Sequence, residues 1–101
     1  MAQPIYKVFL AKPTEAYYAL TQAERDKLYA GHDEASKEAG LKQVINCDSS
    51  WCSDQWPFWG VEKYPSMKAV RKFHAALVAL NWFRYFESTT LLGTAAPEEG
   101  G

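Results

Sequence analysis

Residues 5–11 restrict the fold more than any other segment, because both faces of this short run are apolar. Alternate side chains of an extended strand point to opposite sides of a sheet. The two sets are Tyr6, Val8 and Leu10 on one side, and Ile5, Phe9 and Ala11 on the other. A strand with two apolar faces is central in its sheet and has to be covered on both sides.

The composition makes this requirement harder to meet within a single chain. At 101 residues there is room for one domain, which buries only part of its own surface. Yet 48% of the residues are hydrophobic and 15% are aromatic. This surplus of apolar side chains predicts a partner surface or an apolar pocket.

Two helices and three further strands follow along the chain. Thr21 and Glu24 form a capping box that starts a helix over 21–39, and Gly40 is a typical left-handed stop. An irregular helical turn is expected at 14–20, before this helix. Ser66 caps a second helix, which frays around 81–85. Its expected inward stripe consists of Val70, Phe73, His74, Leu77, Leu80 and Asn81. The remaining strands are expected at 41–48, 56–63 and 86–92.

This β-α-β-β-α-β order predicts an α+β, ferredoxin-like fold: a four-stranded antiparallel sheet with both helices on one face. The other face would be bare, so we expect a second copy to cover it in an isologous homodimer. The domain is expected to span 1–94, and the polar, small-residue segment 95–101 to be a disordered tail.

Charge and cysteine usage exclude several classes of function. The net charge is −1 and no basic stripe is present, so no nucleic-acid partner is expected. No apolar stretch approaches the ~20 residues of a membrane span, and residues 1–4 do not resemble a signal peptide. A cytoplasmic location is therefore expected. In that setting Cys47 and Cys52 are expected to be free thiols, since their spacing fits no zinc or redox motif.

The segment 59–69, with Glu62-Lys63-Tyr64-Pro65 followed by His74, resembles the dimeric α+β barrel superfamily. That superfamily includes antibiotic-biosynthesis monooxygenases, muconolactone isomerase-like proteins and stress-responsive barrel proteins. Residues 13–25 and 82–87 also resemble uncharacterised darcynin-type proteins. The resemblance implies a dimeric barrel with a pocket between sheet and helices in each subunit. It does not select a reaction, because relatives range from cofactor-free oxygenases, isomerases and cyclases to haem-degrading enzymes and proteins without known activity.

His32 and His74 are the only histidines, and both are expected near the inward stripes of their helices. Either imidazole suits general acid–base catalysis, although a histidine on an apolar stripe is also a common core residue. Tyr17 and Asn81 are candidates to steady an oxyanion, with helix capping as an equal alternative for Asn81. The expected substrate-contacting residues, which core or interface packing would equally explain, are Tyr6, Tyr18, Trp51, Trp59, Phe73, Trp82 and Tyr85. No metal-ligand spacing or haem-attachment motif occurs, so neither a metal nor another cofactor is expected.

Three functions remain open from the sequence. The first is a cofactor-independent enzyme of isomerase, cyclase or monooxygenase type, acting by histidine-assisted proton transfer on a hydrophobic aromatic or polyketide-like molecule. The second is a non-catalytic ligand-binding or stress-associated homodimer, and the third a structural or regulatory homodimer. A cavity that reaches both a histidine and a tyrosine hydroxyl would favour the enzyme, whereas an interior filled by rings would favour packing.

Overall fold

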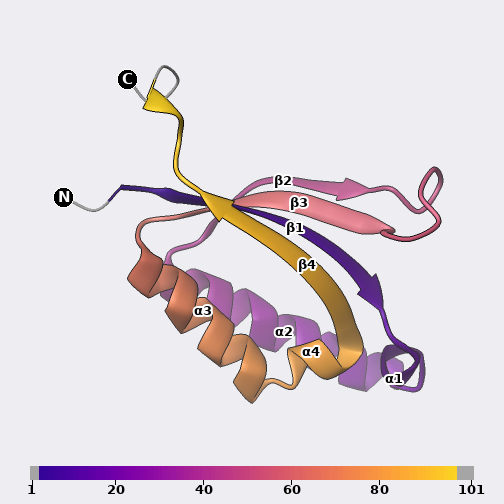
Figure 1. Ribbon diagram of the computed structural model, residues 1–101. Helices are drawn as coiled ribbons and strands as arrows, with labels where there is room; N and C mark the ends of the chain where they lie inside the picture. The colour runs from indigo at the N-terminus through magenta and orange to yellow at the C-terminus, as the bar shows by residue number, and fades with distance from the viewer. Residues whose placement is uncertain (1–2, 98–101) are drawn as a thin grey trace.

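The computed structural model describes residues 3–97, which form one curved sheet with a layer of helices on one side (Figure 1). The molecule is thin, with extents of 46 × 31 × 16 Å. The elements are β1 (Ile5–Pro13), α1 (Glu15–Tyr18), α2 (Gln22–Ala39), β2 (Lys42–Asp48), β3 (Phe58–Tyr64), α3 (Met67–Ala79), α4 (Trp82–Tyr85) and β4 (Phe86–Gly93).

The sheet has the order β2-β3-β1-β4, and all three strand pairs are antiparallel. The predicted ferredoxin-like β-α-β-β-α-β fold is therefore confirmed, and β1 is central as its two apolar faces required. The boundaries differ by small amounts: β1 continues to Pro13, and β3 begins at Phe58 rather than at residue 56. In the second half of the chain α3 ends at Ala79, and α4 is a separate short helix instead of a frayed end.

Capping interactions explain where α2 starts and ends. The Glu24 amide donates to the Thr21 hydroxyl at 3.1 Å, and the Thr21 amide donates to the Glu24 carboxylate at 2.8 Å. Gly40 ends the helix with φ 71°, in the left-handed region that a residue without Cβ adopts without strain. Ser66 starts α3 by accepting a hydrogen bond from the Ala69 amide. All three predicted caps are confirmed.

Cross-strand partners lie on the same face of the sheet, so the register separates the two faces. The pairs Ile5–Tyr64 and Lys7–Glu62 face the helices. Tyr64 and Phe73 are the most deeply buried large side chains, and Ile5 packs against the same core cluster. The main core therefore lies between the β1–β3 pair and the two long helices.

Among residues 3–97 no helix covers the opposite face of the sheet (Figure 1). We call it the open sheet face. Its apolar residues, from the register, are Tyr6, Val8, Leu10, Ile45, Trp59, Val61 and Leu91. None of them is buried, and Leu91 is 73% exposed. The sheet thus presents a continuous apolar surface to solvent in the isolated chain.

The predicted disordered tail at 95–101 extends past Pro97, the last described residue, so it stays a prediction. No helix within residues 3–97 combines the length and the apolar composition needed to cross a bilayer.

Candidate functional site

One stripe of α2 carries three chemically different side chains, Arg25, Tyr29 and His32. Their spacing of i, i+4 and i+7 places them on the same side of a helix. Rings from α1, α3, α4 and the start of β4 pack along this stripe. A guanidinium, a phenol and an imidazole therefore follow one another along a wall of aromatic rings.

The His32 imidazole lies between two of these rings. Its centroid is 4.4 Å from that of Trp82 and 5.3 Å from that of Phe73, the latter at an interplanar angle of 84°. The side chain is only 25% exposed. Burial lowers the pKa of His32, and the negative charges of Glu62 and Asp33 oppose this shift without reversing it. The imidazole is therefore neutral near pH 7 and able to accept a proton.

Tyr29 is the middle residue of the stripe and is 41% exposed. Its hydroxyl lies 2.8 Å from the Tyr17 hydroxyl, and its ring is 6.1 Å from Trp82 and 6.3 Å from Phe86. Burial raises the pKa of Tyr29, and the hydrogen bond with Tyr17 raises it further. The Tyr29 hydroxyl therefore stays protonated at neutral pH and can act as a hydrogen-bond donor.

Arg25 closes the other end of the stripe. Its guanidinium carbon lies 4.6 Å from the centroid of the Tyr17 ring, a cation–π geometry, and one terminal nitrogen donates to the Tyr18 carbonyl at 3.4 Å. The Nε atom is buried without a hydrogen-bond partner among the described residues. The arginine is half-buried, because Tyr17 of α1 lies against its guanidinium.

A buried ion pair lies beyond Phe73 from His32. Lys7 Nζ is 3.3 Å from Glu62 Oε1, and the Tyr64 hydroxyl donates to the same oxygen at 2.8 Å. The ammonium is 5.4 Å from the centroid of Phe73. Burial and the neighbouring carboxylate both raise the pKa of Tyr64. The Glu62 carboxylate thus has two partners, Lys7 and Tyr64, and its field raises the pKa of His32 against the larger effect of burial.

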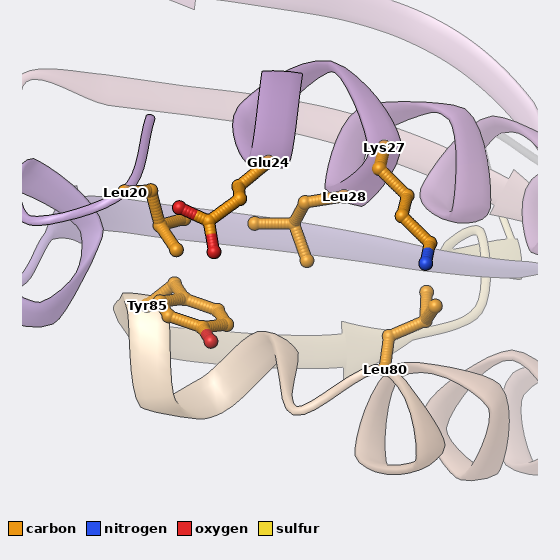
Figure 2. Close-up of a pocket in the computed structure, with 6 residues that line it drawn as sticks. All are labelled: Leu20, Glu24, Lys27, Leu28, Leu80 and Tyr85. Atoms are coloured by element: carbon orange, nitrogen blue, oxygen red, sulfur yellow. The ribbon is translucent and has the colours of Figure 1, made fainter. Parts of the chain in front are cut away.

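A separate groove of about 270 Å³ lies between α2 and the α3–α4 corner. Figure 2 shows the side chains that line it. Leu20, Leu28 and Leu80 give it apolar walls, and Tyr85 projects into it from α4. Glu24 and Lys27 supply the charged groups. Neither histidine lines this groove, so it is not the expected cavity that joins a histidine to a tyrosine hydroxyl.

The structure brings together four of the predicted site residues. These are Tyr17, His32, Phe73 and Trp82, all in the aromatic wall. Tyr85 lies apart, in the groove of Figure 2.

His74 does not lie on the inward stripe as expected. It is exposed and packs on Phe83, with ring centroids 5.1 Å apart. It follows the buried Phe73 by one residue, and one residue turns a helix by about 100°. That rotation is enough to carry the imidazole out of the core. The prediction of an inward orientation is wrong for His74.

Asn81 is also exposed, because α3 ends before the expected stripe reaches it. It takes the left-handed conformation, with φ 59°, and its amide donates to the Val78 carbonyl. Asparagine tolerates this region better than most residues. The C-cap of α3 is Leu80, and Asn81 takes the N-cap position of α4 without a side-chain hydrogen bond, so the helix C-cap alternative is not borne out at Asn81. The expected inward orientation is wrong.

Three expected substrate-contacting residues lie away from the aromatic wall, and a fourth, Tyr18, lies at its edge with its ring 5.7 Å from that of Tyr17. Tyr6 and Trp59 belong to the open sheet face. Trp51 is 82% exposed on the loop between β2 and β3, and Tyr18 is 65% exposed on α1. Their positions suit surface contacts better than a common pocket with His32.

Arg25, Tyr29, Lys7 and Glu62 were not among the sequence-predicted site residues. For the first two, the i, i+4, i+7 spacing with His32 is a signal that the sequence contains. For Lys7 and Glu62 the signal is weaker, because a strand pairing has to be known before they become neighbours. Among residues 3–97 no group of three or more metal-ligating side chains is close enough to hold an ion.

Comparison with known proteins first identifies the fold class of the chain. No protein-family model matches it, and no curated protein matches it in sequence. Solved structures match with the ferredoxin-like α+β architecture, and one of them, from Thermobifida fusca, is described as a dimeric ferredoxin-like protein of unknown function. It has 11% sequence identity and a TM-score of 0.57, and the match covers 94% of this chain and 93% of that one. A hypothetical protein of Arabidopsis thaliana matches at 12% identity and a TM-score of 0.63, over 93% of this chain and 89% of that one.

Within this class, the chain is also similar to chlorite dismutase from Candidatus Nitrospira defluvii. A mutant of that enzyme matches with a TM-score of 0.76 and 25% identity. The match covers 96% of this chain but only 42% of the chlorite dismutase chain. The chain thus spans less than half the length of that enzyme. These structures show the ferredoxin-like α+β fold, whereas the dimer and the narrower resemblance to monooxygenases or isomerases stay predictions.

Proposed function

We propose that this protein is an enzyme that acts on a small aromatic molecule, with His32 as the residue that moves a proton. One observation carries the proposal: a neutral, partly exposed imidazole lies between aromatic rings, in line with Tyr29 on the same helix. An aromatic ligand would pack beside Trp82 and Tyr29, where ring faces favour flat partners. The chemistry proposed is proton transfer, as in isomerisation, cyclisation or oxygenation of an activated phenol, without a cofactor. Among the structural neighbours, the chlorite dismutases are enzymes by name.

The direct test is turnover of a panel of phenols, quinols and polyketide-like aromatics, followed by absorbance and mass spectrometry. Loss of a general acid–base costs about 10²–10⁴-fold in rate, so His32→Gln should lose at least 100-fold. His74→Gln is the matched control, because His74 lies exposed on the outside of α3 and should keep its activity. Equal turnover by wild type and His32→Gln would overturn the proposal.

A structural or regulatory homodimer is the second candidate, and a specific observation favours it. Phe73 and Trp82 pack against His32, and Phe86 stacks on Trp82 with ring centroids 4.4 Å apart. Much of the space between helices and sheet is therefore filled by side chains. A folded dimer that neither binds nor turns over any aromatic of the panel would support this alternative.

We also propose that two copies of the chain pair through the open sheet face. The accessible surface of the chain is 7008 Å². A compact monomer of 11.4 kDa exposes about 5,800 Å². The excess exceeds the roughly 800 Å² that each partner contributes to a standard interface.

Sedimentation velocity tests the dimer. Leu91→Asp places a charge on the open sheet face at a side chain that is 73% exposed, so the protomer should still fold. We expect this variant to sediment as a monomer and the wild type as a dimer. Val78→Asp is the control, since Val78 is 54% exposed on the helical side. A wild-type monomer, or a dimer that Leu91→Asp leaves intact, would contradict the proposal.

A further inference from the structure

Arg25 has a positive charge without a negative partner. The ion pairs within residues 3–97 join other residues, and none involves this guanidinium. It is nevertheless half-buried and held in place by the Tyr17 ring and the Tyr18 carbonyl. Its single side-chain hydrogen bond, at 3.4 Å, leaves most of its five donors unused. An oriented guanidinium with spare donors is suited to a planar anion such as a carboxylate.

The neighbouring hydroxyls add a further donor. Tyr17 and Tyr29 share one hydrogen bond between their hydroxyls, at 2.8 Å. Two hydroxyls carry two protons, and this contact uses one of them. The other proton can be donated to a ligand oxygen. Arg25 is close enough for its charge to lower the pKa of Tyr29, against the larger effect of burial. An anion at this position would therefore meet a cation and a neutral donor together.

The distance along the helix limits the size of such a ligand. Arg25 and His32 are seven residues apart, which corresponds to about 10 Å along the helix axis. The part of the aromatic wall between Arg25 and His32 is formed by Tyr29 and Trp82, whose ring centroids are 6.1 Å apart. A fused two-ring acid is long enough to extend from one end of the stripe towards the other.

We propose that Arg25, together with Tyr17 and Tyr29, binds the carboxylate of an aromatic carboxylic acid whose rings extend along Trp82 towards His32. This inference rests on the proposed function in that it names the ligand class for the same site. It adds that the ligand is an anion held at its carboxylate end, and that recognition depends on α1 and α2 together.

Calorimetric titration with 2-naphthoate and with its uncharged analogue 2-naphthamide tests this inference. We expect the dissociation constant for naphthoate to rise at least tenfold in Arg25→Gln, because a charge-assisted pair is lost. Arg71→Gln removes the same charge from an exposed position on α3 and should bind naphthoate as the wild type does. Arg25→Lys keeps the charge without the planar fork, so an intermediate affinity is expected. Thermal unfolding of each variant shows whether the fold is retained.

Three results would overturn the inference: no binding of naphthoate to the wild type, equal affinities for naphthoate and naphthamide, or equal losses in Arg25→Gln and Arg71→Gln. Should Arg25→Gln fail to fold, Tyr29→Phe provides a second variant, and unchanged naphthoate affinity there would count against the site. The inference fails separately from the proposed function. Binding that depends on Arg25 alongside turnover that His32→Gln leaves unchanged would remove only the proton-transfer role.

Discussion

Replacing Gly60 with alanine should destabilise the protein, although strand propensity alone predicts the opposite. Gly60 lies in β3, paired with Phe9 on one side and Asn46 on the other. A Cβ atom at this position would lie 2.7 Å from the Ile45 carbonyl oxygen and 2.8 Å from two atoms of the Phe9 ring. Contacts this short do not occur in folded proteins, and one of the two obstacles is backbone. Relief therefore requires β2 or the Phe9 ring to shift.

The expected magnitude follows from two opposing terms. Alanine in place of glycine within a strand gains about 0.5–1 kcal/mol of backbone entropy. Overpacking an interior contact costs about 1–3 kcal/mol, and more when backbone has to move. We expect the second term to win, with a net loss of about 1–2 kcal/mol. In a domain of this size each kcal/mol lowers Tm by about 4–8 °C.

Urea unfolding followed by far-UV circular dichroism measures this loss, at one fixed protomer concentration so that association does not confuse the comparison. Gly93→Ala is the matched control, since nothing lies within 4 Å of a Cβ there. That variant should be as stable as the wild type or slightly more stable. If Gly60→Ala matched Gly93→Ala, Phe9 and Ile45 would not lie where the structure has them.

Three further predictions concern the site and its supports. Glu62→Leu should cost about 3–5 kcal/mol in urea unfolding, because it leaves the Lys7 ammonium unpaired in the core; Lys7→Met in the same chain should restore part of the loss, and additive losses would refute the pairing. The folded-state pKa of His32 lies below its unfolded value of 6.5, so stability is greatest above that value and falls as the pH is lowered through the folded-state pKa. Thermal unfolding between pH 7.5 and 5 should therefore show a smaller pH dependence for His32→Phe than for the wild type, and parallel curves would contradict the shift. Thr21→Ala removes the side-chain half of the capping box and should cost about 0.5–2 kcal/mol by the same urea assay, whereas no change would show that the cap is not formed in solution.

The fold followed from sequence because its signals are local. The two apolar faces of β1, the Thr21–Glu24 capping box and Gly40 each depend on residues close together in the chain. Such signals determine where elements begin, where they end and which faces they bury. The element order then leaves few arrangements for the sheet.

The site was harder to predict, because it depends on which elements meet. Helical periodicity alone gives the direction of a side chain only to within a fraction of a turn, and this was too coarse to tell His74 from Phe73. The orientation of Asn81 was predicted wrongly because α3 ends at Ala79. The residues before that end contain no glycine or proline that would indicate a helix stop. The environment of Arg25 depends on α1, because the Tyr17 ring of that helix lies against its guanidinium.

No residue separates α4 from β4: Tyr85 is the last helical position and Phe86 the first extended one. Trp82 and Phe86 therefore stack on each other across a direct junction between helix and strand. Phe86 also pairs with Pro13 at the end of the central strand. Because no loop lies between α4 and β4, a rotation or shift of the Trp82 ring beside His32 has to displace Phe86 and β4 as well. Binding of a ligand at the aromatic wall would therefore shift β4 at the edge of the sheet. Amide hydrogen exchange in β4 would measure this shift.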